Sequence, residues 1–111
     1  MPTIGLDTKI TFATSKARTE VNSFYRALSV QGMTTKVLTL EPNASGSLSL
    51  LGSEFVIIIC LEDCLTITLT NVNNEQSSFL NAGFIVVKAS NLKIVSITNT
   101  DSLPRELSIY Y

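Results

Sequence analysis

The pattern of apolar and polar residues along the chain is that of short β-strands separated by turns. In the clearest stretch, Ser53 to Asn71, an unbroken apolar run from Phe55 to Leu61 is followed by two acidic residues. Apolar residues then alternate with threonine as far as Thr70. Alternation with a period of two is typical of a half-buried strand, and a short apolar run between turn signals is consistent with a fully buried one. We therefore interpret this stretch as a β-hairpin at the centre of an all-β domain.

Other segments along the chain repeat this pattern. Residues 3–13 alternate between apolar and polar positions, as a half-buried strand does. Residues 20–30 are ambiguous, because their apolar residues fit the spacing of a short helix and also share a strand parity, and the surrounding pattern favours the strand. Turn residues separate the other predicted strands, which span residues 35–40, 47–51, 84–88, 92–98 and 106–111.

These elements predict an all-β domain with about eight short strands and no long helix. Closely spaced turn signals are typical of an antiparallel β-sandwich or a jelly-roll-like fold rather than an α/β fold. A length of 111 residues corresponds to a single domain. Within residues 1–111, we expect residues 38–111 to form the core sandwich and residues 1–37 to form an N-terminal segment, as an arm or as the first strands.

The expected register of the hairpin divides it into two faces. With a loop of two or four residues at Glu62-Asp63, one face is wholly apolar and would form the core: Val56, Ile58, Cys60, Leu65, Ile67 and Leu69. The other face carries four large apolar side chains opposite threonines: Phe55, Ile57, Ile59 and Leu61. A sandwich strand needs only one apolar face, and leaving the second in water would forgo about 1.5–3 kcal/mol per side chain. We therefore predict that this row is covered, by a subunit of a homo-oligomer or by another part of the chain.

The two cysteines, Cys60 and Cys64, are too few for a disulfide framework. A three-residue loop would place them opposite one another, where a disulfide is conceivable but strained across so tight a turn. We expect free thiols.

The residues needed for most enzyme chemistry are missing from the sequence. There is no histidine, which removes Ser-His-Asp and Cys-His arrangements and most zinc sites. The adjacent acids Glu62 and Asp63 fit a solvated turn better than a general acid/base pair, and no glycine-containing stretch matches a phosphate-binding loop. We predict no catalytic residue, no metal, no cofactor and no enzymatic activity.

The net charge of −1 does not favour binding to nucleic acid or to an anionic membrane. The charge is uneven, however: residues 1–40 carry five basic and two acidic residues, and residues 41–111 carry three basic and seven acidic ones. Basic residues of the first part are either scattered solvated charges or contacts to an acidic partner surface: Lys9, Lys16, Arg18 and Arg26. No signal peptide and no apolar run of about 18 residues is visible, so we expect a soluble intracellular product or one that is assembled inside a cell.

The last two residues, Tyr110 and Tyr111, are further candidates for contact with a partner. Their aromatic rings would either anchor the last strand to the rest of the domain or form a platform that stacks on a sugar ring or on another protein. The chain has no tryptophan, which weakens the sugar-binding interpretation.

Residues 38–111 have a recognisable order of features. A loop precedes a strand that begins with glycine and then a large aromatic residue (Gly52, Phe55), and Gly83-Phe84 opens a late strand. The chain ends with a hairpin of the form I-x-N, polar loop, L-x-I, which is made by Ile97, Asn99, Leu107 and Ile109. This order resembles the small β-sandwich structural proteins of tailed-bacteriophage virions.

The resemblance implies a non-enzymatic particle component. It favours a capsid decoration (cement) protein that stabilises the head as a symmetric oligomer, with a homotrimer favoured and the major capsid protein or another virion protein as partner. Such a protein would be located in the virion and assembled in the host cytoplasm. The alternatives are a tail, fibre or adaptor component, and a carbohydrate-binding adhesion module.

Overall fold

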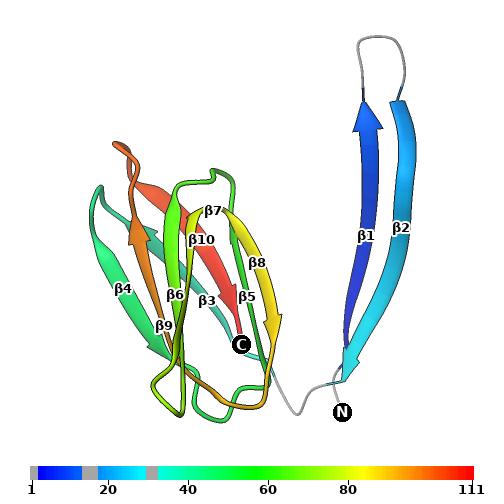
Figure 1. Cartoon of the computed structure of the whole chain (residues 1–111). Coiled ribbons are helices and arrows are strands. Elements are labelled where there is room, and N and C mark those ends of the chain that lie inside the picture. The colour runs from blue at the N-terminus through cyan, green and yellow to red at the C-terminus, as the bar shows by residue number, and fades with distance from the viewer. Residues whose placement is uncertain (1–2, 14–17, 30–32) are drawn as a thin grey trace. The chain divides into compact units, whose positions relative to one another are not determined.

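The computed structural model describes the backbone of residues 3–13 and 18–29, and both backbone and side chains of residues 33–111. The chain forms two compact units, Met1–Met33 and Thr34–Tyr111 (Figure 1). Each unit is described by itself below.

The first unit contains a two-stranded antiparallel sheet. Strand β1 (Thr3–Ala13) pairs with β2 (Arg18–Ser29), with Thr3 opposite Ser29, and the register shifts after Ile10. The ambiguous segment at residues 20–30 is therefore a strand as far as Ser29, and Val30 lies outside the described residues.

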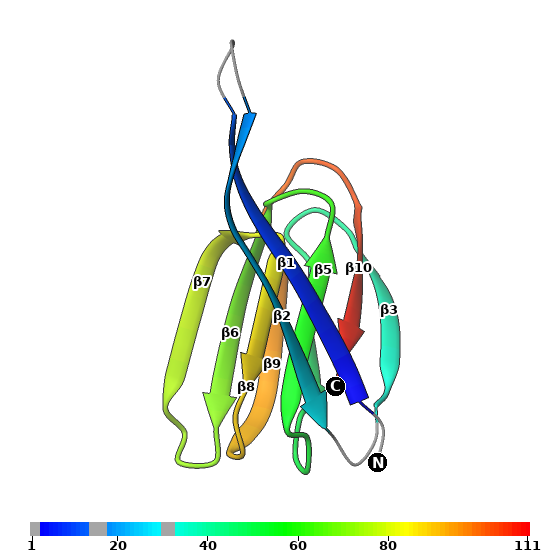
Figure 2. The ribbon, with the colours of Figure 1, turned by 90° about the vertical axis from the view of Figure 1, so that its right-hand side faces the viewer.

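The second unit is a sandwich of two four-stranded antiparallel sheets (Figures 1 and 2). Its strands are β3 (Thr35–Leu40), β4 (Ser45–Ser49), β5 (Phe55–Cys60), β6 (Leu65–Asn71), β7 (Gln76–Ala82), β8 (Phe84–Lys88), β9 (Leu92–Asn99) and β10 (Arg105–Tyr110). One sheet has the order β3-β10-β5-β8 and the other the order β4-β9-β6-β7. In the described ranges every regular element is a strand, so the predicted all-β fold class is confirmed.

The pairing of the eight strands is nested. The first strand of the unit pairs with the last, β4 with β9, β5 with β8, and β6 with β7. The eight strands thus form one long hairpin, with its tip at the turn between β6 and β7. The hairpin is rolled up, so that consecutive strands from β3 to β6, and again from β7 to β10, alternate between the two sheets. This is the jelly-roll arrangement.

The predicted hairpin from Phe55 to Thr70 was wrong in its pairing. Strand β5 pairs with β10 and β8, whereas β6 pairs with β9 and β7 in the opposite sheet. The segment at Glu62-Asp63 is therefore an arch that crosses from one sheet to the other. The six residues predicted to form the core face are nevertheless all buried: Val56, Ile58, Cys60, Leu65, Ile67 and Leu69. A hairpin and an arch can both direct the same alternate residues of each strand towards the core, so the hydrophobic pattern does not distinguish them.

The arch is held by close backbone contacts. The Thr100 N–H and hydroxyl group both donate to the Cys64 carbonyl, at 2.9 and 2.7 Å. A Cβ atom on Gly83 would lie 2.8 Å from the Glu62 carbonyl oxygen and 2.5 Å from the Asp63 carboxylate, so only glycine permits this approach.

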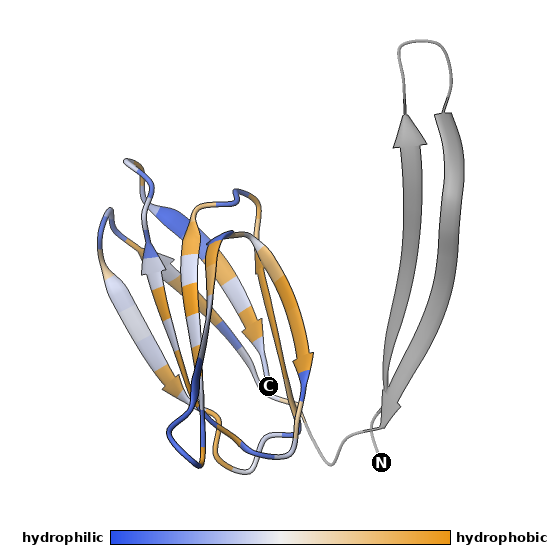
Figure 3. Cartoon of the chain, in the orientation of Figure 1, coloured by the Kyte–Doolittle hydropathy of each residue, from blue (hydrophilic) through white to orange (hydrophobic). Residues whose placement is uncertain are grey.

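Two other strands differ from the sequence prediction. The strand predicted at residues 47–51 lies at Ser45–Ser49, and β7 was not among the predicted strands. Residues Gln76, Ser77 and Ser78 carry no apolar pattern because β7 is an exposed edge strand. In strands such as β6, alternate apolar residues are buried in the core. Figure 3 shows apolar and polar residues alternating along strands of the sandwich.

An ion pair between Asp101, in the loop before β10, and Arg105, the first residue of β10, gives a pH-dependent prediction. The Arg105 Nε–H donates to Asp101 Oδ2 at 2.7 Å, and this bond, with a bond from the Ser102 N–H, lowers the pKa of Asp101 below its ordinary value. Because the folded pKa is depressed, the associated stability is present above the unfolded value of about 3.9 and is lost as the pH falls through the folded pKa.

Urea unfolding of the wild type and Asp101→Asn, from neutral pH down to about pH 3, checks this expectation. The wild type should be the more stable form at neutral pH, and the difference should shrink as the pH falls. A difference that is constant across this range would contradict the assignment.

Candidate functional site

The most distinctive surface of the sandwich is the outward side of the β3-β10-β5-β8 sheet. We call it the outer apolar face. It consists of three exposed residues (Val37, Ile59 and Phe84), two half-buried ones (Val86 and Tyr110) and the buried Ile57. The register places Val37, Ser108, Ile59 and Phe84 side by side across the four strands, and a second row contains Thr35, Tyr110, Ile57 and Val86. Phe84 is 63% exposed, Val37 57% and Ile59 39%, so large apolar side chains remain in water. Contiguous exposed apolar surface of this kind usually marks an interaction site.

The outward side of the other sheet has the opposite character. It presents serine and threonine at most positions, with Ser47, Ser96, Thr68 and Ser78 side by side across the four strands. The Thr68 and Ser78 hydroxyl groups share a hydrogen bond of 3.0 Å. We call this the hydroxyl face. The two sheets of this sandwich therefore differ on their outward sides: one is covered with hydroxyl groups and the other carries the outer apolar face.

The four residues predicted as a subunit interface are not equivalent. Phe55 and Ile57 are buried within the chain, at 1% and 7% exposure, so they are not free for a partner. Leu61 is 97% exposed but lies in the arch beyond the end of β5. Of these four residues, only Ile59 is both exposed and on the outer apolar face. The row has several environments rather than one, because β5 ends at Cys60 and its outward residues are not equally exposed. Its role as a subunit interface stays a prediction.

Sequence reasoning missed Val37 and Phe84 as members of this surface. They come from β3 and β8, which are distant from β5 in the sequence. Only the register of the sheet places them in the same row as Ile59. A signal existed for Phe84, because Ile85 faces the core and its neighbours must then face outward.

The predicted contact residues of the N-terminal segment lie on the first unit. Lys9 is on β1, and Arg18 and Arg26 are on β2. Lys16 lies outside the described residues.

The two terminal tyrosines have different environments. Tyr110 is half-buried on the outer apolar face, beside Ile57. Tyr111 packs against the core, and its backbone exchanges hydrogen bonds of 2.6 and 2.9 Å with Thr34. Tyr111 therefore pins the end of the chain to the start of β3.

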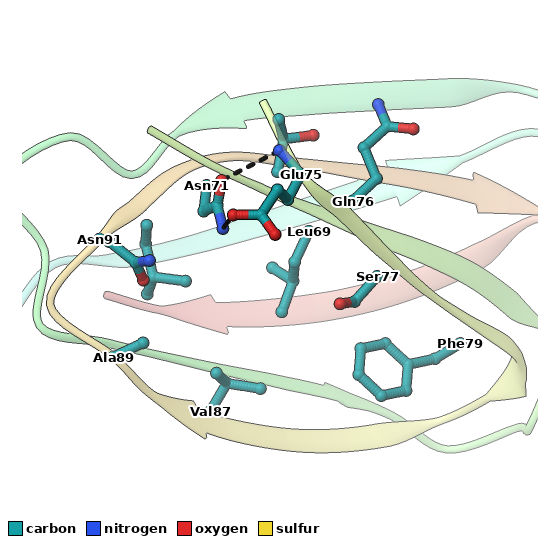
Figure 4. Close-up of a pocket in the computed structure, with 11 residues that line it drawn as sticks. Leu69, Asn71, Glu75, Gln76, Ser77, Phe79, Val87, Ala89 and Asn91 are labelled. Carbon is teal, nitrogen blue, oxygen red and sulfur yellow. Dashed lines mark hydrogen bonds between the residues drawn. The ribbon is translucent and has the colours of Figure 1, made fainter. Parts of the chain in front are cut away.

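A groove lies between β7 and β8, the adjoining edges of the two sheets (Figure 4). Its volume is about 320 Å³, and its walls include Leu69 and Phe79 from one sheet and Val87 from the other. At one end the Glu75 N–H donates to the Asn71 side-chain oxygen at 3.0 Å, and the Asn71 amide donates to Glu75 Oε1 at 3.3 Å. The groove therefore combines an apolar middle with a polar end.

The cysteines have a structural rather than a reactive environment. Cys60 and Cys64 are both buried free thiols, as predicted. Burial raises the pKa of the Cys64 thiol, and the adjacent Cys60 raises it further. A raised pKa keeps a thiol protonated at neutral pH and so unreactive.

Within the residues that the structure describes, no group of three or more histidine, cysteine, aspartate or glutamate side chains is arranged to hold a metal ion. The same residues include no helix long and apolar enough to cross a membrane.

No protein-family model matches the chain, and no curated protein matches it. A crystal structure of Drosophila melanogaster CENP-C bound to CAL1 is similar in fold, with a TM-score of 0.50 and 12% identity over 91% of this chain and 79% of that chain. The Schizosaccharomyces pombe Cnp3 cupin domain has a TM-score of 0.48 and 9% identity over 96% of this chain and 81% of that chain. At such low identity the likeness concerns the fold alone.

The CENP-C structure contradicts the predicted function of a bacteriophage capsid decoration protein. CENP-C is not a virion protein, and its similar fold gives no support to a cement protein, a homotrimer or a tail, fibre or adhesion component. The resemblance to phage proteins and the predicted location stay predictions. What the CENP-C structure does show is a protein of similar fold bound to another protein.

Proposed function

We propose that this chain is a protein-interaction module that self-associates through the outer apolar face. The observation that carries the proposal is the exposure of Val37, Ile59 and Phe84 in one row across one sheet, with Ser108 between Val37 and Ile59, while the other sheet is covered with hydroxyl groups. Fully burying an exposed side chain of this kind contributes about 1.5–3 kcal/mol, and a side chain that is already partly buried contributes less. The similar fold of a protein seen bound to CAL1 supports protein binding as a use of this architecture.

A second copy of the chain is the partner that fits this face. The central rows of the face contain no charged side chain, so two identical faces can stack without bringing like charges together. The nearest charges on the outward side are Glu106 on β10 and Lys88 on β8, which lie towards opposite ends of the sheet and have opposite sign. Stacking two sheets about 10 Å apart is an ordinary solution for apolar sheet faces.

The proposal predicts a dimer that one charge on the outer apolar face disrupts. Ile59→Lys should convert a dimeric wild type to a monomer, because the interface would have to bury an unpaired ammonium group. Thr68→Lys is the matched control, because Thr68 lies on the hydroxyl face, and it should leave the dimer intact. Sedimentation velocity or light scattering across a micromolar concentration series measures the mass. A monomeric wild type at the top of the series would overturn the proposal.

A further inference from the structure

A second surface, separate from the outer apolar face, is the free edge of β7. This strand is the last in the order β4-β9-β6-β7, so in the described part of the chain its outer row of backbone N–H and C=O groups has no strand beside it. Edge strands are usually protected by charged side chains, proline or short length. β7 spans seven residues without a charge or a proline, and its exposed residues include Leu80, which is 71% exposed.

The other edges of the sandwich are better protected. In the opposite sheet β3 carries Lys36 and β8 ends at Lys88. The remaining edge strand, β4, is a five-residue segment in which serine alternates with Gly46 and the half-buried Leu48. Among these four strands, β7 has the longest uncharged edge.

The groove lies on the inward side of this edge. Ser77 and Phe79 pair with Leu69 and Ile67, which face the core, so both point toward the seam between the sheets (Figure 4). Val87 and Ala89 line the opposite wall. A strand added to the β7 edge would extend the β4-β9-β6-β7 sheet, and every second side chain of that strand would turn inward over the seam.

We propose that the β7 edge and the adjoining groove bind an extended segment of a partner protein by β-strand addition. Backbone hydrogen bonds to β7 supply the pairing, and apolar side chains at alternate positions enter the groove between Phe79 and Val87. A volume of about 320 Å³ accommodates one or two such side chains. Glu75 is the one charged residue among the described residues lining the groove, so a basic residue of the segment is favoured at that end.

A display library of short random peptides, panned against the full chain, provides the probe for this proposal. The enriched peptides should have apolar residues at alternate positions, and a synthetic copy should bind the wild type in solution. Ser77→Arg places a bulky charge in the groove and is expected to weaken binding about tenfold or more. Ser78→Arg is the matched control, because the neighbouring Ser78 faces the hydroxyl face, and it should bind as the wild type does.

Hydrogen exchange separates strand addition from side-chain binding alone. The bound peptide should slow exchange of backbone amides in β7 and leave those of β4 unchanged. Ile59→Lys should bind the peptide normally, so a failure of the self-association proposal leaves this test intact. Panning without enrichment, peptides that bind Ser77→Arg as tightly as the wild type, or unchanged β7 exchange would each overturn the proposal.

Discussion

Replacing Asn99 with alanine is expected to lower the free energy of unfolding by about 2–4 kcal/mol. The side chain is fully buried, and its amide donates to the Leu40 and Leu103 carbonyl oxygens at 2.9 Å each. Its oxygen accepts a bond of 2.9 Å from the Asp101 N–H. Alanine would leave two carbonyl groups and one N–H without these partners. The lost bonds connect the end of β9 to the end of β3 and to the loop before β10.

Two further variants sharpen this test, which uses urea unfolding with the slope compared between proteins. Asn99→Asp keeps the size of the side chain but replaces its donor with an acceptor, so it should cost at least as much as alanine at neutral pH. Asn73→Ala, in an exposed turn, is the control and should change stability by no more than about 0.5 kcal/mol. A loss below about 1 kcal/mol for Asn99→Ala would show that water replaces the lost partners.

The role of Asn99 illustrates what the sequence alone could not provide. An asparagine after an apolar strand indicates a turn, and the sequence pattern accordingly placed a polar loop after Asn99. Its hydrogen bond to Leu40, far away in the sequence, depends on the nested pairing that brings the end of β3 beside the start of β10. Local turn chemistry carries no information about such a partner.

The hydrophobic pattern was informative about which residues are buried and uninformative about which strands are neighbours. Val56 and Ile67 were correctly placed in the core, because parity is a property of each strand separately. The pairing of β5 with β10 rather than β6 follows from the path of the whole chain. The same limitation hid the outer apolar face. Its exposed members Val37, Ile59 and Phe84 come into one row only through the register between strands that are not consecutive.

Two adjacent residues of β5 are expected to separate stability from assembly. Ile58 is fully buried between Ile109 and Ile85 on the core side, whereas Ile59 is 39% exposed on the outer apolar face. Ile58→Ala should therefore cost about 2–5 kcal/mol through lost burial and a cavity. Ile59→Ala should cost less than half as much, because its side chain is already partly in water.

This comparison has to be made in a monomer, because dimerisation would add to the apparent stability of any variant that still associates. A Phe84→Lys background removes association without changing the core, so urea unfolding of both alanine variants in that background isolates the fold. Without Phe84→Lys, sedimentation should show that Ile59→Ala weakens the dimer and that Ile58→Ala, while folded, does not. Equal losses of stability for the two variants would mean that β5 is covered on both sides within one chain, and the apolar face would then have no room for a second copy.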